Sequence, residues 1–370
     1  MKIDGAILWE IGQEWSIEEI ELGDPRQGEV KVQLTATGMC HSDDHLLYGD
    51  TPMDLPVIGG HEGAGVVVEV GPGTTDVNVG DHVVLSFVPA CGRCLPCSSG
   101  HQNLCDLGMH LLSGGSISDG TCRVSARGKD VQAFCLLGTF APYVVVHEAS
   151  VIKIPDYIPL DLAALVGCGV PTGWGSSVYA ADVKPGENVV VMGAGGVGMN
   201  AIQGAAGAGA RRVIAIDPIE FKRESAGTFG ATDTFASAEQ ALEGVRELTW
   251  GRMADKVIVA VSRLETDHVK QALDLAGKNG TVVLTAVGSA LDVDVRLNLT
   301  ELTFFQKRIQ GAVFGAGNPR FDIPQLLGLW EQGKLNLADL ITSRYKLEEI
   351  NQAYRDQREG RIIRGIIEYT

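Results

Sequence analysis

The hydrophobic pattern of the chain changes character near residue 170. Before that point, short runs rich in Val and Ile are bounded by Gly, Pro and Asp, which is the pattern of β-strands. We expect strands over 28–38, 63–71, 81–87 and 143–154. The first 150 residues are therefore predicted to be β-rich.

After residue 170 apolar runs alternate with segments of helical length. Strict alternation predicts right-handed crossovers and a doubly wound parallel sheet with helices on both faces. The tail returns to mixed structure. We predict an α/β fold in which a domain of residues 170–312 is inserted into a β-rich domain of residues 1–169 and 313–370. The expected strands are 188–193, 211–217, 256–261, 281–287, 308–315 and 361–369, and the expected helices are 196–210, 219–230, 238–249 and 266–277.

Size and charge narrow the range of functions. A chain of 370 residues exceeds what one hydrophobic core usually organises. Thirty Lys and Arg against 46 Asp and Glu give a formal charge of 30 − 46 = −16, which repels nucleic acid and anionic lipid. The N-terminus lacks a signal-peptide pattern, and no apolar run approaches the roughly 20 residues of a membrane span. We expect a cytoplasmic protein with reduced cysteines and no nucleic-acid or membrane partner.

A glycine-rich motif follows the first strand of the inserted domain. Gly193, Gly195, Gly196, Val197 and Gly198 belong to a G-x-G-x-x-G motif that opens a helical segment. Such glycines permit a tight turn, close approach of a pyrophosphate and close packing of helix on strand. Asp217 follows Gly198 by 19 residues, where a carboxylate accepts hydrogen bonds from ribose and repels a 2′-phosphate. An ordinary glycine-rich turn is the alternative, but the position between strand and helix favours a site for NAD(H) over NADP(H).

Four cysteines lie on one short loop, residues 91–105. Cys91, Cys94, Cys97 and Cys105 form C-x2-C-x2-C-x7-C among Gly, Pro and Ser. Four thiolates suit tetrahedral Zn²⁺ with no position left open, which is the pattern of a structural site. A disulfide pair is disfavoured by the reducing compartment. An iron–sulfur cluster is disfavoured because the run lacks the bacterial ferredoxin spacing.

A second set of metal-binding side chains is dispersed along the chain. Cys40 lies in GMCHSDDH, His61 in GGHEGAG and Cys168 in VGCGVPTG. Two thiolates and an imidazole leave a fourth position open, as in a catalytic zinc site whose ion lowers the pKa of an alcohol. Each residue alone has a simpler interpretation, since a lone buried cysteine is usually a small hydrophobe. We interpret Cys122 and Cys135 as cysteines of this kind, without a role in metal binding.

These motifs together resemble the zinc-dependent medium-chain alcohol dehydrogenase family. The resemblance rests on GHEGAG, the four-cysteine loop, GCGVPTG, GAGGVG and Asp217, in that order over nearly the whole chain. It implies a GroES-like catalytic domain, a Rossmann domain, two Zn²⁺ per chain and hydride exchange between an alcohol or aldehyde and NAD(H). It also implies a homo-oligomer, a dimer rather than a tetramer, and RIQGAVFG suggests a sheet edge for subunit pairing.

The resemblance assigns roles to further residues. It implies that Asp43 orients the zinc-bound imidazole, that Glu62 approaches the metal from behind His61, and that Ser42 and His45 relay the proton of the alcohol. A surface histidine is the simpler interpretation of His45. The resemblance places coenzyme phosphate or ribose contacts at His41, Lys222 and Arg364, nicotinamide contacts at Thr172 and Val197, and a substrate-pocket aromatic at Phe87.

Two subgroups of that family compete. Glutathione-dependent formaldehyde dehydrogenases carry an arginine where Met109 falls and an acidic residue where Thr51 falls, so this thiol-adduct reaction is disfavoured. The actinobacterial nicotinoproteins resemble the chain in GMCHSDDHL, VVLSFVPACGRC and DPIEFKRE. They imply tightly bound NAD(H) and an external redox carrier of mycofactocin type. A zinc-loop redox sensor without catalysis and a zinc-free quinone reductase are the remaining alternatives, and both are disfavoured by the complete ligand set.

Overall fold

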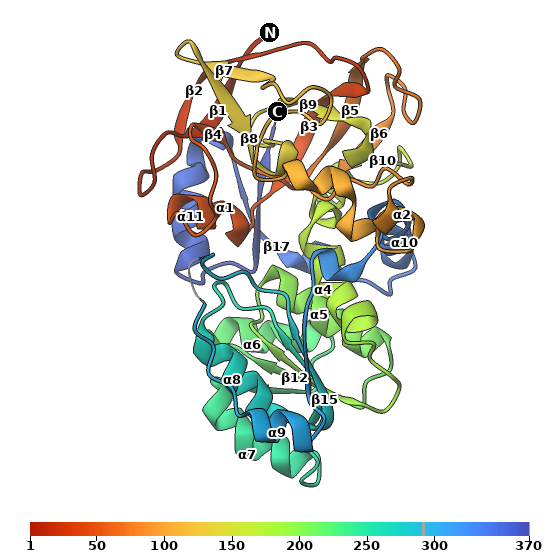
Figure 1. Cartoon of the computed structure of the whole chain (residues 1–370), viewed down its shortest axis with the longest axis vertical. Coiled ribbons are helices and arrows are strands. Elements are labelled where there is room, and N and C mark those ends of the chain that lie inside the picture. The colour runs from red at the N-terminus through yellow and green to blue at the C-terminus, as the bar shows by residue number, and fades with distance from the viewer. Residues whose placement is uncertain (291–292, 370) are drawn as a thin grey trace. The chain divides into compact units, whose positions relative to one another are not determined.

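The computed structural model describes residues 1–290 and 293–369 and divides the chain into two compact units (Figure 1). The first unit comprises Met1–Cys168, Asn318–Glu331 and Leu337–Thr370. The second unit comprises Gly169–Gly317 and Gln332–Asn336. Each unit has its own sheets and its own core.

The first unit contains a small closed barrel and a larger sheet of seven strands. Strand β3 (Glu29–Gly38) is central to the sheet because it pairs antiparallel with β5, β9 and β18. Val30, Val32 and Leu34 alternate along β3 and are buried, as the period of two predicts for a half-buried strand. The barrel consists of β1 (Lys2–Leu8), β2 (Ser16–Leu22), β7 (Val124–Ala126), β8 (Lys129–Ala133) and β4 (Val57–Ile58). The sheet has the order β10 (Val151–Ile154), β6 (His82–Leu85), β5 (Gly63–Val70), β3, β18 (Arg364–Glu368) and β17 (Ile341–Tyr345). Its seventh strand, β9 (Tyr143–His147), pairs with β3.

The second unit is a parallel sheet of six strands in the order β13-β12-β11-β14-β15-β16. Numbered along the unit this is 3-2-1-4-5-6, the strand order of the Rossmann fold. The predicted α/β class, with a doubly wound sheet beside a β-rich part, is confirmed. The strands are β11 (Asn188–Met192), β12 (Arg212–Ile216), β13 (Asp233–Phe235), β14 (Ala254–Val259), β15 (Ala276–Leu284) and β16 (Arg308–Gly311), and the helices that follow the first four are α5 (Gly196–Gly207), α6 (Glu220–Ala226), α7 (Ala238–Leu248) and α8 (Thr266–Leu275).

Several predicted strand limits are wrong. The strand expected over 143–154 is two strands, β9 and β10, separated by a 3₁₀ turn at Glu148–Ser150. The His147 side chain accepts the backbone N–H of Ala149 and thereby stabilises that turn. The strand expected over 308–315 ends at Gly311, and the chain then turns through Phe314 with φ of 52°. Apolar residues continue past both breaks, so hydrophobicity alone did not reveal them.

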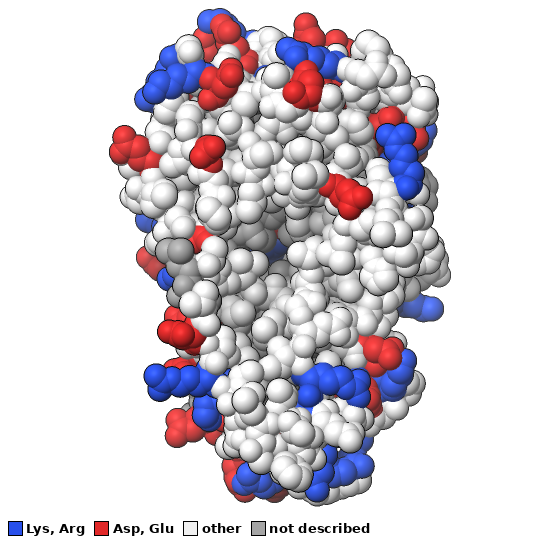
Figure 2. All heavy atoms as spheres, in the orientation of Figure 1, with Lys and Arg blue, Asp and Glu red and all other residues white. Residues whose placement is uncertain are grey.

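The surface carries both signs of charge. On the face drawn in Figure 2, Lys and Arg side chains are interspersed with Asp and Glu rather than gathered into one basic area. Within the part of the chain that the structure describes, no helix has both the length and the apolar composition needed to span a bilayer.

Candidate functional site

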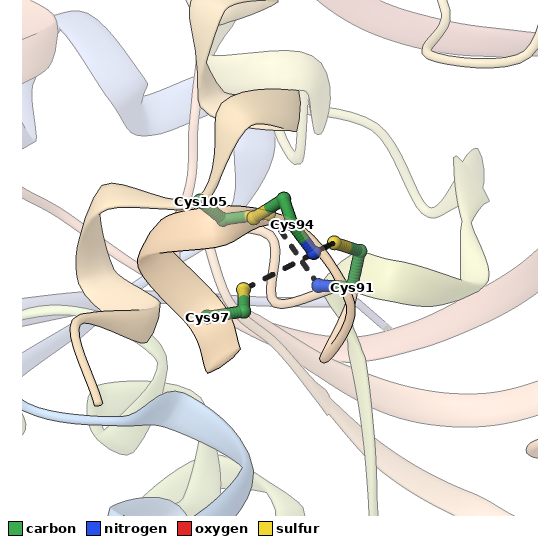
Figure 3. A group of neighbouring side chains, drawn as sticks. All are labelled: Cys91, Cys94, Cys97 and Cys105. Carbon is green, nitrogen blue, oxygen red and sulfur yellow. Dashed lines mark hydrogen bonds between the residues drawn. The ribbon is translucent and has the colours of Figure 1, made fainter. Parts of the chain in front are cut away.

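The four-cysteine loop brings its thiols together in the first unit (Figure 3). Cys91 and Cys94 precede the short helix α2 (Leu95–Ser98), Cys97 lies within it, and Cys105 follows a 3₁₀ turn. Their four sulfur atoms lie within 4.8 Å of one another. Backbone N–H groups of Cys91, Cys94 and Asp106 each donate to one of these sulfurs at 3.4 Å, which stabilises thiolates.

The geometry of this loop fits a tetrahedral metal ion. The sulfur atoms of Cys91 and Cys97 are 4.0 Å apart, and those of Cys94 and Cys105 are 3.8 Å apart. Four sulfurs at about 2.3 Å from a zinc ion stand about 3.8 Å from each other. All eight cysteines of the chain are free thiols here, so the loop is not closed by a disulfide.

A second cluster joins segments that are distant in sequence. Cys40 caps helix α1 (His41–Leu47) directly after β3, His61 and Glu62 precede β5, and Cys168 follows a 3₁₀ turn at Leu165–Gly167. Ligand atoms of all four residues lie within 4.8 Å of one another, and all four side chains are buried. The structure therefore brings together the three ligands named from sequence, with the carboxylate of Glu62 beside them. Two thiols, one imidazole and one carboxylate are a donor set that suits zinc.

Several groups fix the imidazole of His61. Its Nδ1 lies 3.3 Å from the carboxylate of Asp43, which also accepts the backbone N–H of Gly60 at 2.8 Å. The rings of Phe87 and Phe134 stand edge-on to the imidazole, with centroids at 5.8 and 5.4 Å. Asp43 and Phe87 were named from sequence, whereas Phe134 was missed. The neighbouring Cys135 has φ of 52°, and this strained turn leaves no signature in a hydrophobic pattern.

Glu62 contacts a cation as well as the cluster. Its Oε1 accepts a hydrogen bond from the buried guanidinium of Arg364, while within the described residues its Oε2 has no hydrogen-bond partner. Burial raises the pKa of Glu62 to about 7 against the opposing effect of Arg364. Arg364 is 4% exposed, and its guanidinium is bonded to Glu62. One carboxylate oxygen of Glu62 lies within 4.8 Å of the ligand atoms of Cys40, His61 and Cys168. A buried carboxylate with one unpartnered oxygen beside such atoms is a setting that a cation satisfies.

The two residues expected to relay a proton lie on α1, the helix that begins after Cys40. The hydroxyl of Ser42 lies 3.5 Å from the sulfur of Cys40. His45 is 5% exposed, and its Nδ1 lies 3.0 Å from the carboxylate of Asp50. His45 is therefore not a surface side chain. Asp50 was missed, because a partner five residues away in a loop carries no periodic signal.

The glycine motif of the second unit forms a tight turn between β11 and α5. Gly193 has φ of +93°, and a Cβ there would lie 2.6 Å from the carbonyl oxygen of Ala260. A Cβ on Gly198 would overlap the carbonyl oxygen of Gly193. At Gly195, the N-cap of α5, no described atom lies within 4 Å of such a Cβ. Gly193 and Gly198 are thus required by packing. Gly195 leaves open space at a helix N-terminus, where a phosphate binds well.

The other residues expected near the coenzyme are distributed over both units. Asp217, at the end of β12, accepts the backbone N–H groups of Ala194 and Ile219 at 2.8 and 2.9 Å. Burial lowers the pKa of Lys222 on α6. Thr172 lies on α4 (Gly169–Gly175), which packs closely on α5, where Gly196 and Val197 form the first turn. His41 belongs to the first unit, and its Nδ1 lies 3.3 Å from the side-chain nitrogen of Gln357.

Comparison with known proteins places this site in a family. Residues 26–156 match the alcohol dehydrogenase GroES-like domain, and residues 196–332 match the zinc-binding dehydrogenase domain. Over 371 residues the chain is 55% identical to alcohol dehydrogenase B of Mycobacterium tuberculosis, covering 100% of this chain and 99% of that protein. The chain belongs to the zinc-binding alcohol dehydrogenase family.

Two further members of this alcohol dehydrogenase family extend the comparison. The NDMA-dependent alcohol dehydrogenase of Amycolatopsis methanolica is 48% identical over 370 residues, with both chains covered in full. The crystal structure of benzyl alcohol dehydrogenase from Acinetobacter calcoaceticus superposes with a TM-score of 0.92 at 31% identity, again over 100% of both chains. The chain is accordingly an oxidoreductase with a GroES-like domain and a Rossmann-type domain.

Proposed function

We propose that this alcohol dehydrogenase oxidises a primary alcohol to an aldehyde, or runs the reverse reaction, by exchanging hydride with NAD(H) at a zinc site. The observation that carries the proposal is the buried convergence of Cys40, His61 and Cys168 beside Glu62. Zinc held there would act as a Lewis acid that lowers the pKa of the alcohol hydroxyl. A second zinc in the four-cysteine loop would be structural.

The first unit supplies the acid–base chemistry, and we propose residues 1–169 and 313–370 as the catalytic domain. Asp43 holds Nδ1 of His61, so the other ring nitrogen would be the one that binds a metal ion. Ser42 would touch the alcohol oxygen, and the support for this role is that its hydroxyl lies 3.5 Å from the sulfur of Cys40. His45, whose imidazole is held by Asp50, is the terminal base. Phe87 covers one edge of His61 and contributes apolar surface for the substrate.

The second unit supplies the coenzyme site, with residues 170–312 as the proposed domain. Gly193, Gly195, Gly196 and Gly198 would bring backbone N–H groups to the pyrophosphate. Asp217 would accept from the adenosine ribose and select NAD(H) over NADP(H) by charge repulsion. Thr172 and Val197 would contact the nicotinamide, and Lys222 would neutralise phosphate or bind ribose. The same kind of contact is proposed for His41 and Arg364, which belong to the first unit. NAD(H) supplies the hydride acceptor or donor.

We further propose that NAD(H) remains bound through turnover and passes electrons to an external carrier of mycofactocin type. Support comes from the 48% identical relative whose name describes it as NDMA-dependent. The alternative thiol-adduct formaldehyde reaction is less well supported. Met109, which is 79% exposed, and Thr51 stand where that subgroup has an arginine and an acidic residue.

A second copy of this chain is the protein partner we propose, as a dimer. Strand β16 ends the sheet of the second unit, and within the described residues its outer edge pairs with no strand. Phe304, Phe305 and Val313 next to β16 are exposed. An unpaired edge beside exposed apolar side chains favours pairing with an identical edge. Light scattering should give twice the chain mass of 39.3 kDa, and a monomer at all concentrations would refute the dimer.

Metal content and turnover of two matched variants test the proposal. The wild-type chain should hold two zinc ions and reduce NAD⁺ when given benzyl alcohol. Cys40→Ser should hold one zinc ion and lose turnover while still binding NAD(H) in the second unit. Cys122→Ser removes a thiol outside both clusters and should keep both ions and full activity. Near-normal turnover by Cys40→Ser would refute the zinc assignment, and wild-type protein with one ion and no turnover would favour a redox sensor.

A further inference from the structure

One face of the C-terminal helix contacts the helix that begins at Cys40. Helix α11 (Ile350–Arg358) presents Tyr354, Gln357 and Arg358 on the same side, as the i, i+3, i+4 spacing requires. The hydroxyl of Tyr354 donates to the Cys40 carbonyl oxygen at 3.4 Å. Arg358 binds both carboxylate oxygens of Asp44 at 2.7 and 3.0 Å. All these residues belong to the first unit.

The side chain of Tyr354 is packed firmly where its hydroxyl contacts the first turn of α1. The residue is 1% exposed, and its ring packs on Trp15 and Phe140 with centroids at 6.3 and 6.2 Å. The Cys40 carbonyl that it contacts also accepts the backbone N–H of Asp43 at 3.3 Å. The donor from α11 therefore bonds the same oxygen that closes the first turn of α1.

Arg358 fixes the next part of the same helix. Asp44 is 4% exposed, so its carboxylate needs a bonded cation, and the two-point contact with Arg358 determines both distance and direction. Asp43, the residue before it, holds the imidazole of His61. A shift of α1 would thus displace both the sulfur of Cys40 and the carboxylate that orients His61.

We propose that Tyr354 and Arg358 are positioning residues for the zinc site, and that α11 acts as a brace on the turn carrying Cys40 and Asp43. The proposal rests on the function proposed above for the cluster of Cys40, His61 and Cys168. Neither residue touches metal, alcohol or coenzyme in this role. Their effect is on how firmly the cluster retains its ion.

Zinc release to an excess of EDTA tests the brace. Tyr354→Phe keeps the ring but removes the donor, and Arg358→Gln removes the charge. Each should speed loss of the cluster zinc about tenfold, the lower end of what loss of a ligand-orienting partner costs, while release from the four-cysteine loop stays unchanged. Co²⁺ substituted at the cluster should show shifted visible bands in both variants.

Two control variants separate positioning from general loosening. Tyr345→Phe removes a hydroxyl bonded to Asp356 on the same helix, and Arg355→Gln removes a cation of α11 that binds Glu14. Both controls should release zinc as the wild type does. Unchanged cluster release in Tyr354→Phe and Arg358→Gln would overturn the brace, and so would equal acceleration at both zinc sites. A wild-type chain that never loads the cluster would instead overturn the proposed function, and the brace with it.

Discussion

The carboxylate of Glu62 fills the space that a side chain at Gly38 would occupy. A Cβ built on Gly38 overlaps Oε2 of Glu62, while Oε1 of the same carboxylate is bonded to Arg364. Glycine is thus required at the end of β3 because a buried acid packs against its Cα. This close approach keeps Glu62 next to the sulfur and imidazole atoms of the cluster.

Gly38→Ala should therefore destabilise the first unit by about 1–3 kcal/mol, the usual cost of forcing extra volume into a packed core. Gly328→Ala is the matched control, because no described atom lies within 4 Å of its added Cβ and it sits in helix α10 (Pro319–Glu331) of the same unit. The control should be neutral or slightly stabilising. Urea unfolding measures both variants, and equal midpoints would contradict the packing argument.

Replacing a loop cysteine should affect stability rather than chemistry. Cys97→Ser removes one of four ligands, and a structural zinc contributes directly to folding. We expect loss of one zinc ion per chain and a melting temperature lower by on the order of 10 °C. Activity per correctly folded chain at low temperature should be retained. Selective loss of turnover without loss of stability would show that this loop has a different role.

Removing the charge of Asp217 should change coenzyme preference. Asp217→Ala should weaken NADH binding roughly tenfold, because a charged hydrogen-bond partner contributes about 1.5–3 kcal/mol. The N–H groups of Ala194 and Ile219 bond to different oxygens of Asp217, so Asp217→Asn removes the charge and keeps an acceptor for only one of them. Both variants should bind NADPH better relative to NADH. Titration of the intrinsic protein fluorescence with NADH and with NADPH gives the ratio of the two dissociation constants. An unchanged ratio in the variants would refute the role of this carboxylate.

Stability should depend on the ionisation of Glu29. Burial raises its pKa, but hydrogen bonds from Arg123, Ser116, Arg26 and Ser118 outweigh this and hold the pKa below its ordinary value. A carboxyl whose pKa is lowered by folding stabilises the protein above its unfolded pKa, and that contribution is lost as pH falls through the folded value.

Glu29→Gln should therefore lower the melting temperature most at neutral pH, and its difference from wild type should shrink below about pH 4. Glu69→Gln, which removes a half-exposed carboxylate bonded to Lys31, is the control and should have a small effect throughout. A difference between Glu29→Gln and wild type that stays constant from pH 7 to pH 3.5 would contradict this account.

The sequence predicted those parts of the molecule that depend on local pattern. Alternation of apolar runs with helical segments gave the parallel sheet of the second unit, because each crossover needs a helix between strands. The glycine motif could be recognised from the sequence because the turn at Gly193 and the close packing at Gly198 exclude other side chains. The metal-binding loop could be recognised because its ligands, Cys91, Cys94, Cys97 and Cys105, are closely spaced in the sequence.

Long-range contacts were not predictable from a single sequence. One local feature was also missed, because the 3₁₀ turn at Glu148–Ser150 interrupts an apolar run without a glycine or proline to mark it.

The long-range contacts of the site join residues whose own sequence surroundings are unremarkable. Phe134 and Tyr354 look like ordinary core residues, and only the folded chain brings them to His61 and Cys40. The Arg364–Glu62 pair joins residues 302 positions apart, so no window of sequence contains it.

The absorbance spectrum of extensively dialysed, zinc-loaded protein tests directly whether the cluster of Cys40, His61 and Cys168 supports alcohol oxidation with NAD(H). It is recorded before and after benzyl alcohol is added, first without NAD⁺ and then with one equivalent. We expect a reduced-nicotinamide band that depends on alcohol and is absent in Cys40→Ser. A band that forms without added NAD⁺ and persists through gel filtration would further support resident coenzyme. If no primary alcohol produces the band in the wild type even after NAD⁺ is supplied, the chain does not carry out the proposed reaction.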